Sequence, residues 1–164
     1  MATVTTKQVW AEIGRRSFAV VSFLSLDGEP RSAGVVYTVA GHRLLFASGR
    51  VSWKVRGLRA DPHIAITVTV VRRIPFMPWI PIPAATIGFH GTASISAVDD
   101  VDAAACRRLL GPRWDDPVVR DATCIVTVSP EGRFATHGIG VSLREMRDSV
   151  RARGHAPVGK TPAG

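Results

Sequence analysis

The sequence is poor in cysteine and contains no long apolar run. Its two cysteines, Cys106 and Cys124, lie far apart without CxxC spacing, so they do not form a metal site by themselves. This scarcity also argues against a secreted disulfide scaffold and favours buried thiols in a reducing cytoplasm. No apolar stretch approaches the ~20 residues of a transmembrane helix. Residues 1–10 lack the basic and apolar segments of a signal peptide, so we expect a cytoplasmic protein.

Lysine is also rare, although the chain is basic overall. The 164 residues include 21 basic and 13 acidic side chains, a formal net charge of +8, yet the lysines are Lys7, Lys54 and Lys160 alone. The excess positive charge fits either a solvated arginine-rich surface or an anionic ligand such as a phosphate. Nucleic acid is the weaker alternative, because no basic cluster alternates with aromatic residues.

Obvious reactive centres are missing as well. The sequence suggests no catalytic triad and no paired carboxylates, so we assign no catalytic residue. His63, His90 and His137 are scattered, and none has a ligand partner at metal spacing, so we expect no metal site. Such a protein can still catalyse a reaction if a bound cofactor supplies the chemistry.

The first half of the chain predicts an antiparallel meander with two short helices. Asp27-Gly28 and Ala40-Gly41-His42 mark tight turns between strands rich in β-branched residues. Asp61-Pro62 ends the second helix, because proline disfavours a helical residue before it. The predicted strands are 17–25, 31–39, 43–47 and 63–71, and the predicted helices are 5–15 and 52–60.

The second half predicts more strands and two further helices. Asp99 or Asp100 caps a helix that Gly111-Pro112 ends. A turn at Pro130-Glu131-Gly132 separates two strands, and the tail from Gly154 is expected to be disordered. The predicted strands are 86–97, 122–129 and 133–137, and the predicted helices are 101–110 and 142–151.

These elements together predict a mainly β (α+β) fold. Strands joined mostly by hairpins exclude a doubly wound parallel sheet. We expect one domain over residues 1–153, a small antiparallel β-barrel of about six or seven strands with short helices, followed by a disordered tail over 154–164.

Residues 72–85 form an apolar segment with four prolines, which disfavours regular structure. Such a segment covers a partner subunit, a ligand or a membrane surface. Phe76 and Trp79 are candidates either for the wall of a substrate cleft or for a subunit contact. Arg72 and Arg73 flank the segment and are the feature that favours binding to a membrane surface.

The most informative segment is the passage from a strand into the helix that follows it. It reads Ser48-Gly49-Arg50, and then Ser52 and Lys54 in the first helical turn. The backbone N–H groups of a first helical turn have no intrahelical partner, and the helix dipole favours an anion there. Two hydroxyl groups and two cations at the same place predict a phosphate site.

The order of these motifs is similar to that of the pyridoxamine 5′-phosphate oxidase-like split-barrel family. This family includes FMN-binding proteins and actinobacterial reductases that use the deazaflavin F420. An actinobacterial source also fits a chain rich in arginine, alanine and valine. The similarity covers residues 17–71 well, and the segment GFHGTASI with the following helix more loosely. The matching motifs are Asp27-Gly28-x-Pro30, Ser48-Gly49-Arg50, Lys54, Leu58 and Asp61-Pro62.

The resemblance implies a fold, an assembly and a cofactor. The fold is an antiparallel split barrel, the assembly is a homodimer with cofactor sites in the clefts between the subunits, and the cofactor is F420 or FMN. The resemblance places the cofactor ring along the strand backbone at Ser32, Ala33, Gly34, Val35 and Val36. It places the cofactor phosphate at Ser48, Gly49, Arg50, Ser52 and Lys54.

The chain departs from the oxidase at the phosphate-binding motif. The Ser-Arg-Lys of the oxidase reads Ser52-Trp53-Lys54 here, so one guanidinium is missing unless Arg50 or Arg56 replaces it. The substrate-binding C-terminal segment of the oxidase also has no clear counterpart. We therefore do not expect oxidation of pyridoxamine phosphate.

These observations leave three functional hypotheses. The first is an F420- or FMN-dependent oxidoreductase that transfers a hydride to or from a small organic substrate. The second is a split-barrel protein that binds a flavin, haem or lipid without turnover, with His63, His90 or His137 as the haem ligand. The third is a basic protein that associates with nucleic acid or a membrane surface. Tyr37 either contacts substrate or cofactor, or packs inside the barrel.

Overall fold

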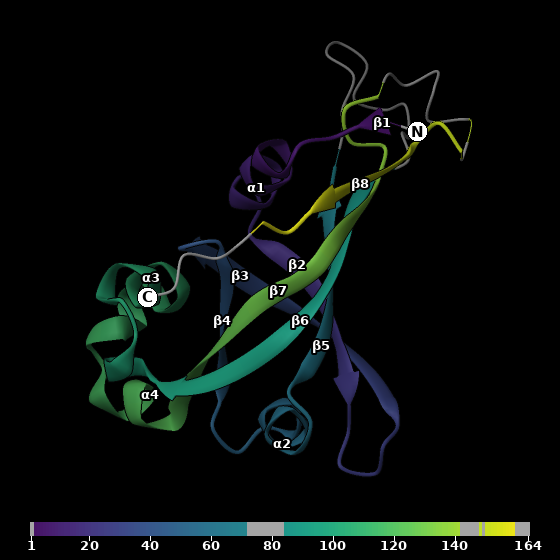
Figure 1. The fold of residues 1–164 in the computed structure, drawn as a ribbon. Coiled ribbons are helices and arrows are strands. Elements are labelled where there is room, and N and C mark those ends of the chain that lie inside the picture. The colour runs from purple at the N-terminus through teal and green to yellow at the C-terminus, as the bar shows by residue number, and fades with distance from the viewer. Residues whose placement is uncertain (1, 72–83, 142–147, 149, 160–164) are drawn as a thin grey trace, which may run out of the picture.

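The computed structural model describes residues 2–71, 84–141, 148 and 150–159. Six antiparallel strands follow one another in the order β7-β4-β3-β2-β5-β6, and pairing of β6 with β7 closes them into a barrel (Figure 1). This confirms the predicted antiparallel split barrel. The six strands are β2 (Phe18–Leu24), β3 (Pro30–Ala40), β4 (Arg43–Gly49), β5 (His63–Val70), β6 (Ala85–Ala97) and β7 (Thr123–His137).

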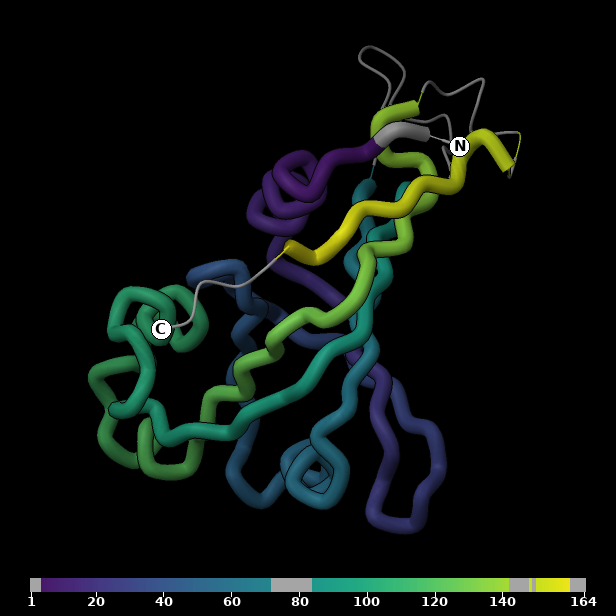
Figure 2. Tube along the Cα trace, in the orientation of Figure 1, coloured from purple at the N-terminus to yellow at the C-terminus, as the bar shows by residue number. Residues whose placement is uncertain are grey.

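Short helices cover the barrel. The helix α1 (Thr6–Gly14) begins after Thr5, whose hydroxyl accepts the backbone N–H of Gln8 at 3.3 Å and so caps the helix. The helix α2 (Trp53–Ala60) connects β4 to β5. The helices α3 (Ala103–Leu110) and α4 (Pro117–Ala122) lie together beside one end of the barrel (Figure 2). In the described part of the chain, no helix is long and apolar enough to cross a membrane.

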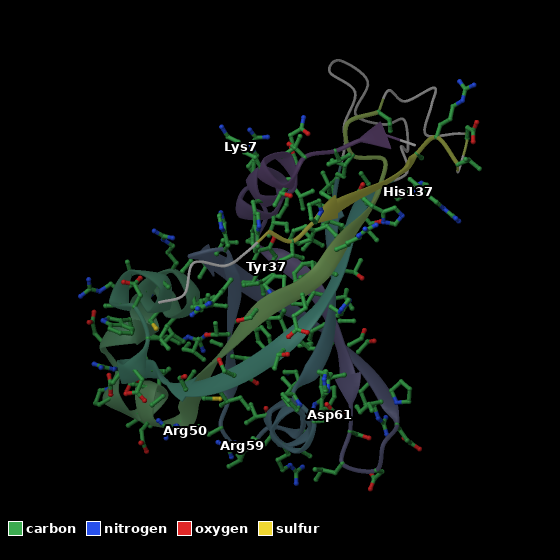
Figure 3. All side chains as sticks on the ribbon, in the orientation of Figure 1. Lys7, Tyr37, Arg50, Arg59, Asp61 and His137 are labelled. Atoms are coloured by element: carbon green, nitrogen blue, oxygen red, sulfur yellow. The ribbon has the colours of Figure 1, made fainter. Side chains whose placement is uncertain are left out.

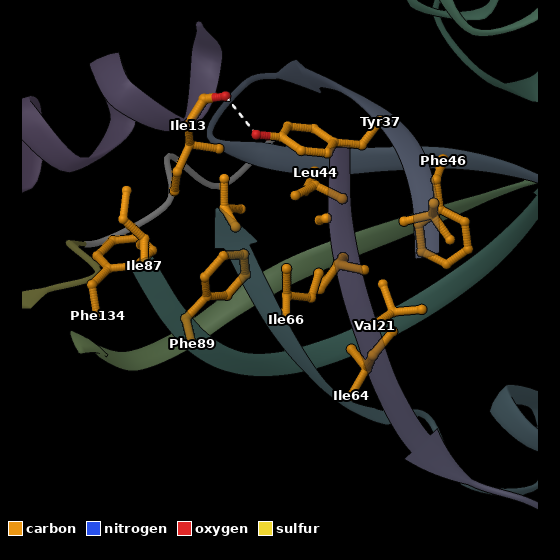
Figure 4. Close-up of a cluster of buried hydrophobic side chains, with 14 of the residues drawn as sticks. Ile13, Val21, Tyr37, Leu44, Phe46, Ile64, Ile66, Ile87, Phe89 and Phe134 are labelled. Atoms are coloured by element: carbon orange, nitrogen blue, oxygen red, sulfur yellow. Dashed lines mark hydrogen bonds between the residues drawn. The ribbon is translucent and has the colours of Figure 1, made fainter. Parts of the chain in front are cut away.

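Alternating residues along the strands fill the barrel interior. In β5 every second side chain, from Ile64 to Val70, is buried. Figure 4 shows side chains of several strands meeting in one cluster, among them Val21, Ile66 and Phe89. A smaller cluster packs α3 against β4 and β7 through Leu45, Ala105, Cys106, Leu110 and Ile125.

Tyr37 belongs to the main cluster. Of the two roles that the sequence leaves open for it, the structure therefore shows packing inside the barrel. It is 3% exposed, and its hydroxyl donates to the carbonyl oxygen of Ile13 at 2.7 Å (Figure 4). Burial raises the pKa of Tyr37 well above its ordinary value, although the positive charge of Arg16 acts in the opposite direction.

This burial predicts a specific alkaline response. The phenol of the unfolded chain ionises near pH 10, whereas the folded protein keeps Tyr37 protonated above that pH. The folded state therefore binds more protons, and the free energy of unfolding falls as the pH rises above about 10. Because Tyr37 is the single tyrosine, phenolate absorbance reports on it alone. We expect phenolate to form together with unfolding followed by circular dichroism. Ionisation near pH 10 in a protein that stays folded would contradict the burial.

The predicted turn at residues 130–132 is wrong, and so, as described below, is part of the prediction for the tail. Pro130-Glu131-Gly132 does not separate two strands, because β7 is continuous from Thr123 to His137 and pairs with β6. Gly132 has φ +68°, and the β6–β7 register shifts between Gly88 and His90, so a bulge replaces the expected turn.

The tail from Gly154 is not disordered over its first residues. The strand β8 (Arg153–Pro157) pairs with the edge of β7 and, in parallel, with β1 (Ala2–Thr3). The hydroxyl of Thr6 donates to the carbonyl oxygen of Pro157 at 2.6 Å and fastens this strand to α1. The edge of β7 provides the pairing that the glycine- and proline-rich composition of the tail does not suggest.

Other predictions shift or lie outside the described residues. The cap of α3 is Asp102, whose carboxylate accepts the N–H of Ala105, instead of Asp99 or Asp100. These two aspartates lie in the 3-10 turn η1 (Val98–Asp100). Most of segment 72–85 and most of the predicted helix 142–151 fall outside the described residues.

Candidate cofactor site

The first half of β3 has a free edge. It pairs with β2 there, whereas its pairing with β4 begins only at Tyr37. The backbone N–H of Tyr37 donates to Ser17 at 2.8 Å, so the alternation of an antiparallel ladder turns the N–H and C=O groups of Ser32, Gly34 and Val36 away from β2. Figure 1 shows the β2–β3 hairpin diverging from the end of β4, with α2 between them. Among the described residues no strand occupies this edge, which can therefore hydrogen-bond a flat heteroaromatic ring.

Two serine hydroxyls meet where β4 passes into α2. The Oγ atoms of Ser48 and Ser52 lie 3.0 Å apart, at hydrogen-bonding distance. Ser52 Oγ also accepts the backbone N–H of Val55 at 3.3 Å and so caps α2. The backbone N–H groups of Trp53 and Lys54, at the first two helical positions, have no intrahelical acceptor. The turn therefore offers N–H and O–H groups to an anion.

The two predicted cations differ in how firmly they are held. Arg50 is attached to β7, because its Nε donates to the carbonyl oxygen of Thr123 at 3.1 Å. Lys54 makes no ion pair among the described residues, and its Nζ lies 5.5 Å from the ring centroid of Trp53. That indole stacks on Phe23 of β2 at 5.3 Å. The stacking contact fixes the start of α2 against the barrel and leaves the Lys54 ammonium available.

A cavity of about 510 Å³ adjoins both elements of the site. It lies between α2 and the turn that joins β2 to β3. We refer to it as the α2 cavity; its lining residues are Ser25, Leu26, Asp27, Arg31, Trp53 and Arg56. Arg31 directly precedes Ser32 in β3, and Trp53 is the first residue of α2, so the cavity lies beside both elements.

The predicted cofactor-binding residues form two groups, one along the first half of β3 and one at the turn between β4 and α2, and neither group lines the α2 cavity itself. Along β3, Ser32, Gly34 and Val36 are exposed, while Val35 is buried and Ala33 is half-buried. Tyr37 lies in the barrel interior. Phe76 and Trp79 fall outside the described residues. The phosphate-binding candidates Ser48, Gly49, Arg50, Ser52 and Lys54 gather at the single turn between β4 and α2.

The sequence did not reveal a second groove, which contains two histidines. Its volume is about 350 Å³, and its lining includes His63 of β5 and His90 of β6. His63 Nδ1 lies 2.6 Å from the Asp61 carboxylate, which also accepts the His63 backbone N–H at 3.0 Å. The hydrogen bond from the His63 backbone is the largest cause that lowers the pKa of Asp61, and the hydrogen bond with the His63 ring lowers it further. In the described part of the chain, no three metal-ligating side chains come together. The alternation of side chains along each strand places both histidines on the outside of the barrel. Their proximity follows from the register between β5 and β6, which the sequence does not give.

Comparison with known proteins finds similarity in structure. No protein-family model and no curated protein matches the sequence. A haem-binding protein of Mycobacterium smegmatis superposes with a TM-score of 0.67 at 15% identity, over 93% of this chain and 57% of that protein. This chain thus spans little more than half the length of that protein.

Two other solved structures match over more of their own length. An F420 reductase superposes with a TM-score of 0.55 at 20% identity, over 76% of this chain and 93% of that one. A protein of Listeria innocua, provisionally assigned as a pyridoxamine 5′-phosphate oxidase, gives 0.60 at 15% identity, over 83% and 98%. At these identities the likeness establishes the fold. The resemblance to the pyridoxamine 5′-phosphate oxidase-like split barrel is therefore confirmed as a structural one.

Proposed function

We propose that this chain binds F420 or FMN and is an oxidoreductase acting on a small organic substrate. The observation that carries the proposal is that two binding elements each contribute a neighbouring residue to the lining of the α2 cavity, Arg31 from β3 and Trp53 from α2. One element is the free edge of β3, and the other is the start of α2 with Ser48, Ser52 and Lys54. The solved split-barrel structures with flavin-related names support the same assignment.

The residues present fit a cofactor with a flat ring and a phosphate. Backbone groups of Ser32, Gly34 and Val36 suit the polar edge of the ring. The hydroxyls of Ser48 and Ser52, two helical N–H groups and the Lys54 ammonium suit the phosphate. When bound, the cofactor accepts or donates a hydride, and the chain's part is to orient the ring and exclude water. The excess of basic residues favours F420, which carries further anionic groups, but FMN would use the same phosphate site.

Fluorescence titration of the purified apoprotein with F420 and, separately, with FMN tests this proposal. Saturable binding of one of them at a stoichiometry of one per chain is the expected result. The proposal is overturned if the apoprotein binds neither F420 nor FMN.

We also propose a cytoplasmic location, in keeping with the two free and buried cysteines.

We further propose that the protein is a homodimer. The outer face of the β2–β3 hairpin exposes apolar side chains, with Phe18 51% and Val36 62% exposed. The Phe18 ring lies against Gly34, where an added Cβ would be 2.9 Å from it, so this face is smooth and apolar next to the free edge of β3. Such a surface suits a second copy of the chain, which would then help to enclose the cofactor.

Placing charges on this face should dissociate the dimer. We expect the Phe18→Glu, Val36→Glu double variant to sediment as a monomer, because burying two carboxylates at an interface is costly. Val118→Glu is the matched control, since Val118 is 74% exposed but lies on α4. A monomeric parent protein, or an equal effect of both changes, would contradict the assigned interface. Circular dichroism checks that each variant is folded.

The second groove, which His63 and His90 line, favours one alternative function, non-catalytic haem binding. Its apolar lining, including Phe23, Leu24 and Ile64, accompanies His63 and His90 as possible iron ligands. Reconstitution with hemin would then give a Soret band that His63→Ala or His90→Ala removes. A spectrum that neither change alters would exclude this groove.

A further inference from the structure

The α2 cavity combines a cationic end with an apolar wall. We infer that it binds a flat carboxylate with a single negative charge, which is the substrate class of the oxidoreductase proposed above and rests on that proposal. A volume of about 510 Å³ suits a small organic molecule. The assignment follows from the charges, the wall and the position of the cavity.

Of the two guanidinium groups that line the cavity, Arg56 is the one without a carboxylate partner in the described part of the chain. Arg56 is exposed and makes no ion pair among the described residues. Arg31 is already paired, because its NH2 group donates to the Glu29 carboxylate at 2.7 Å. Asp27 adds a negative charge to the lining. A monoanion therefore fits better than a phosphate dianion, and the planar fork of Arg56 matches a carboxylate.

The wall of the cavity is aromatic and held in place. Trp53 is 44% exposed, and its ring is fixed by the stack on Phe23. Leu26, which is 61% exposed, adds apolar surface from the β2–β3 turn. Trp53 and Arg56 are three residues apart in α2 and so lie on the same side of the helix. An indole and a guanidinium side by side suit an aromatic ring that carries a carboxylate.

The position of the cavity makes it a substrate site instead of the phosphate site. The serine pair that would hold the cofactor phosphate, Ser48 and Ser52, is absent from its lining. Arg31 directly precedes Ser32, where the free edge of β3 begins to present backbone groups away from β2. A ligand in the α2 cavity would therefore lie beside a ring bound along that edge.

Isothermal titration calorimetry of the apoprotein with 2-naphthoate and with neutral 2-naphthamide tests the inference. We expect 2-naphthoate to bind at least about tenfold more tightly, because its carboxylate accepts a stronger, charge-assisted hydrogen bond from Arg56 than the neutral amide does. Arg56→Gln should remove this preference. Arg59→Gln is the matched control, since Arg59 is also an exposed arginine of α2 but is absent from the cavity lining.

Three results would overturn the inference. These are equal binding of the two probes, an equal loss of preference in Arg56→Gln and Arg59→Gln, or displacement of 2-naphthoate by the cofactor that binds in the separate titration. Displacement would mean that the cavity belongs to the cofactor. Absence of cofactor binding alone overturns the proposed oxidoreductase, whereas absence of the carboxylate preference alone overturns this inference, so the two failures are distinguishable.

Discussion

Replacing Lys54 with alanine is expected to weaken cofactor binding by about 10- to 100-fold. The reason is the loss of a charge-assisted hydrogen bond to the phosphate, worth about 1.5–3 kcal/mol. Lys54 lies in the first turn of α2 beside the capping serine and makes no ion pair among the described residues. Its removal should leave the fold intact. Fluorescence titration with F420 or FMN gives the affinity, and thermal unfolding gives the stability.

Lys7 provides the matched control for this change. It is an exposed lysine in α1, far from α2, as Figure 3 shows. Lys7→Ala lowers the net charge by the same amount, so it separates a local contact from the general attraction of a basic protein for an anion. Equal affinities for the Lys54→Ala and parent proteins would remove the main support for the phosphate site.

Ser52 is a less suitable residue for the same test. Its hydroxyl both caps α2, through the N–H of Val55, and lies 3.0 Å from the hydroxyl of Ser48. Loss of a helix cap costs about 0.5–2 kcal/mol of stability. A Ser52→Ala protein would therefore mix a structural effect with an effect on binding, whereas Lys54→Ala acts at the site alone.

Local signals in the sequence predict the part of the fold that contains the site. Asp27-Gly28 specifies one tight turn, Gly41-His42 another, and Ser52 marks the start of α2. In each case a few adjacent residues determine the backbone, so the predicted and observed elements agree closely. The phosphate-binding candidates come together for the same reason, because they lie within seven consecutive residues, 48–54.

Features that depend on pairing between distant segments could not be predicted in this way. Pro130-Glu131-Gly132 carries turn residues, but pairing with β6 keeps β7 extended through a bulge. Gly154 begins a tail rich in glycine and proline, but the edge of β7 makes its first residues a strand. The stack of Trp53 on Phe23 likewise joins segments that only the fold brings together. The α2 cavity likewise combines two separate segments, the hairpin at residues 25–31 and α2, so no local pattern indicates it.

Gly91→Ala is the small substitution from which we expect the largest loss of stability, because Gly91 lies where the barrel closes. Gly91 lies in β6 opposite Pro130 of β7, at the seam that closes the barrel. A Cβ atom added there would overlap the carbonyl oxygen of Ser129. The obstructing atoms belong to the backbone, so no side chain can rotate away, and the strands must separate. Overpacking costs about 1–3 kcal/mol and occasionally more, and we expect a loss at the upper end of this range.

Gly88→Ala is the matched control, because Gly88 also lies in β6 and pairs with the same two strands, β5 and β7. The nearest atom to a Cβ added there is the carbonyl oxygen of Ala135, at 3.9 Å, an ordinary contact. We therefore expect its free energy of unfolding to stay within about 1 kcal/mol of the parent value. Urea denaturation of the three proteins measures the difference. Equal stability of the two variants would mean that β6 and β7 can separate at Gly91 without cost, and that barrel closure does not depend on this close approach.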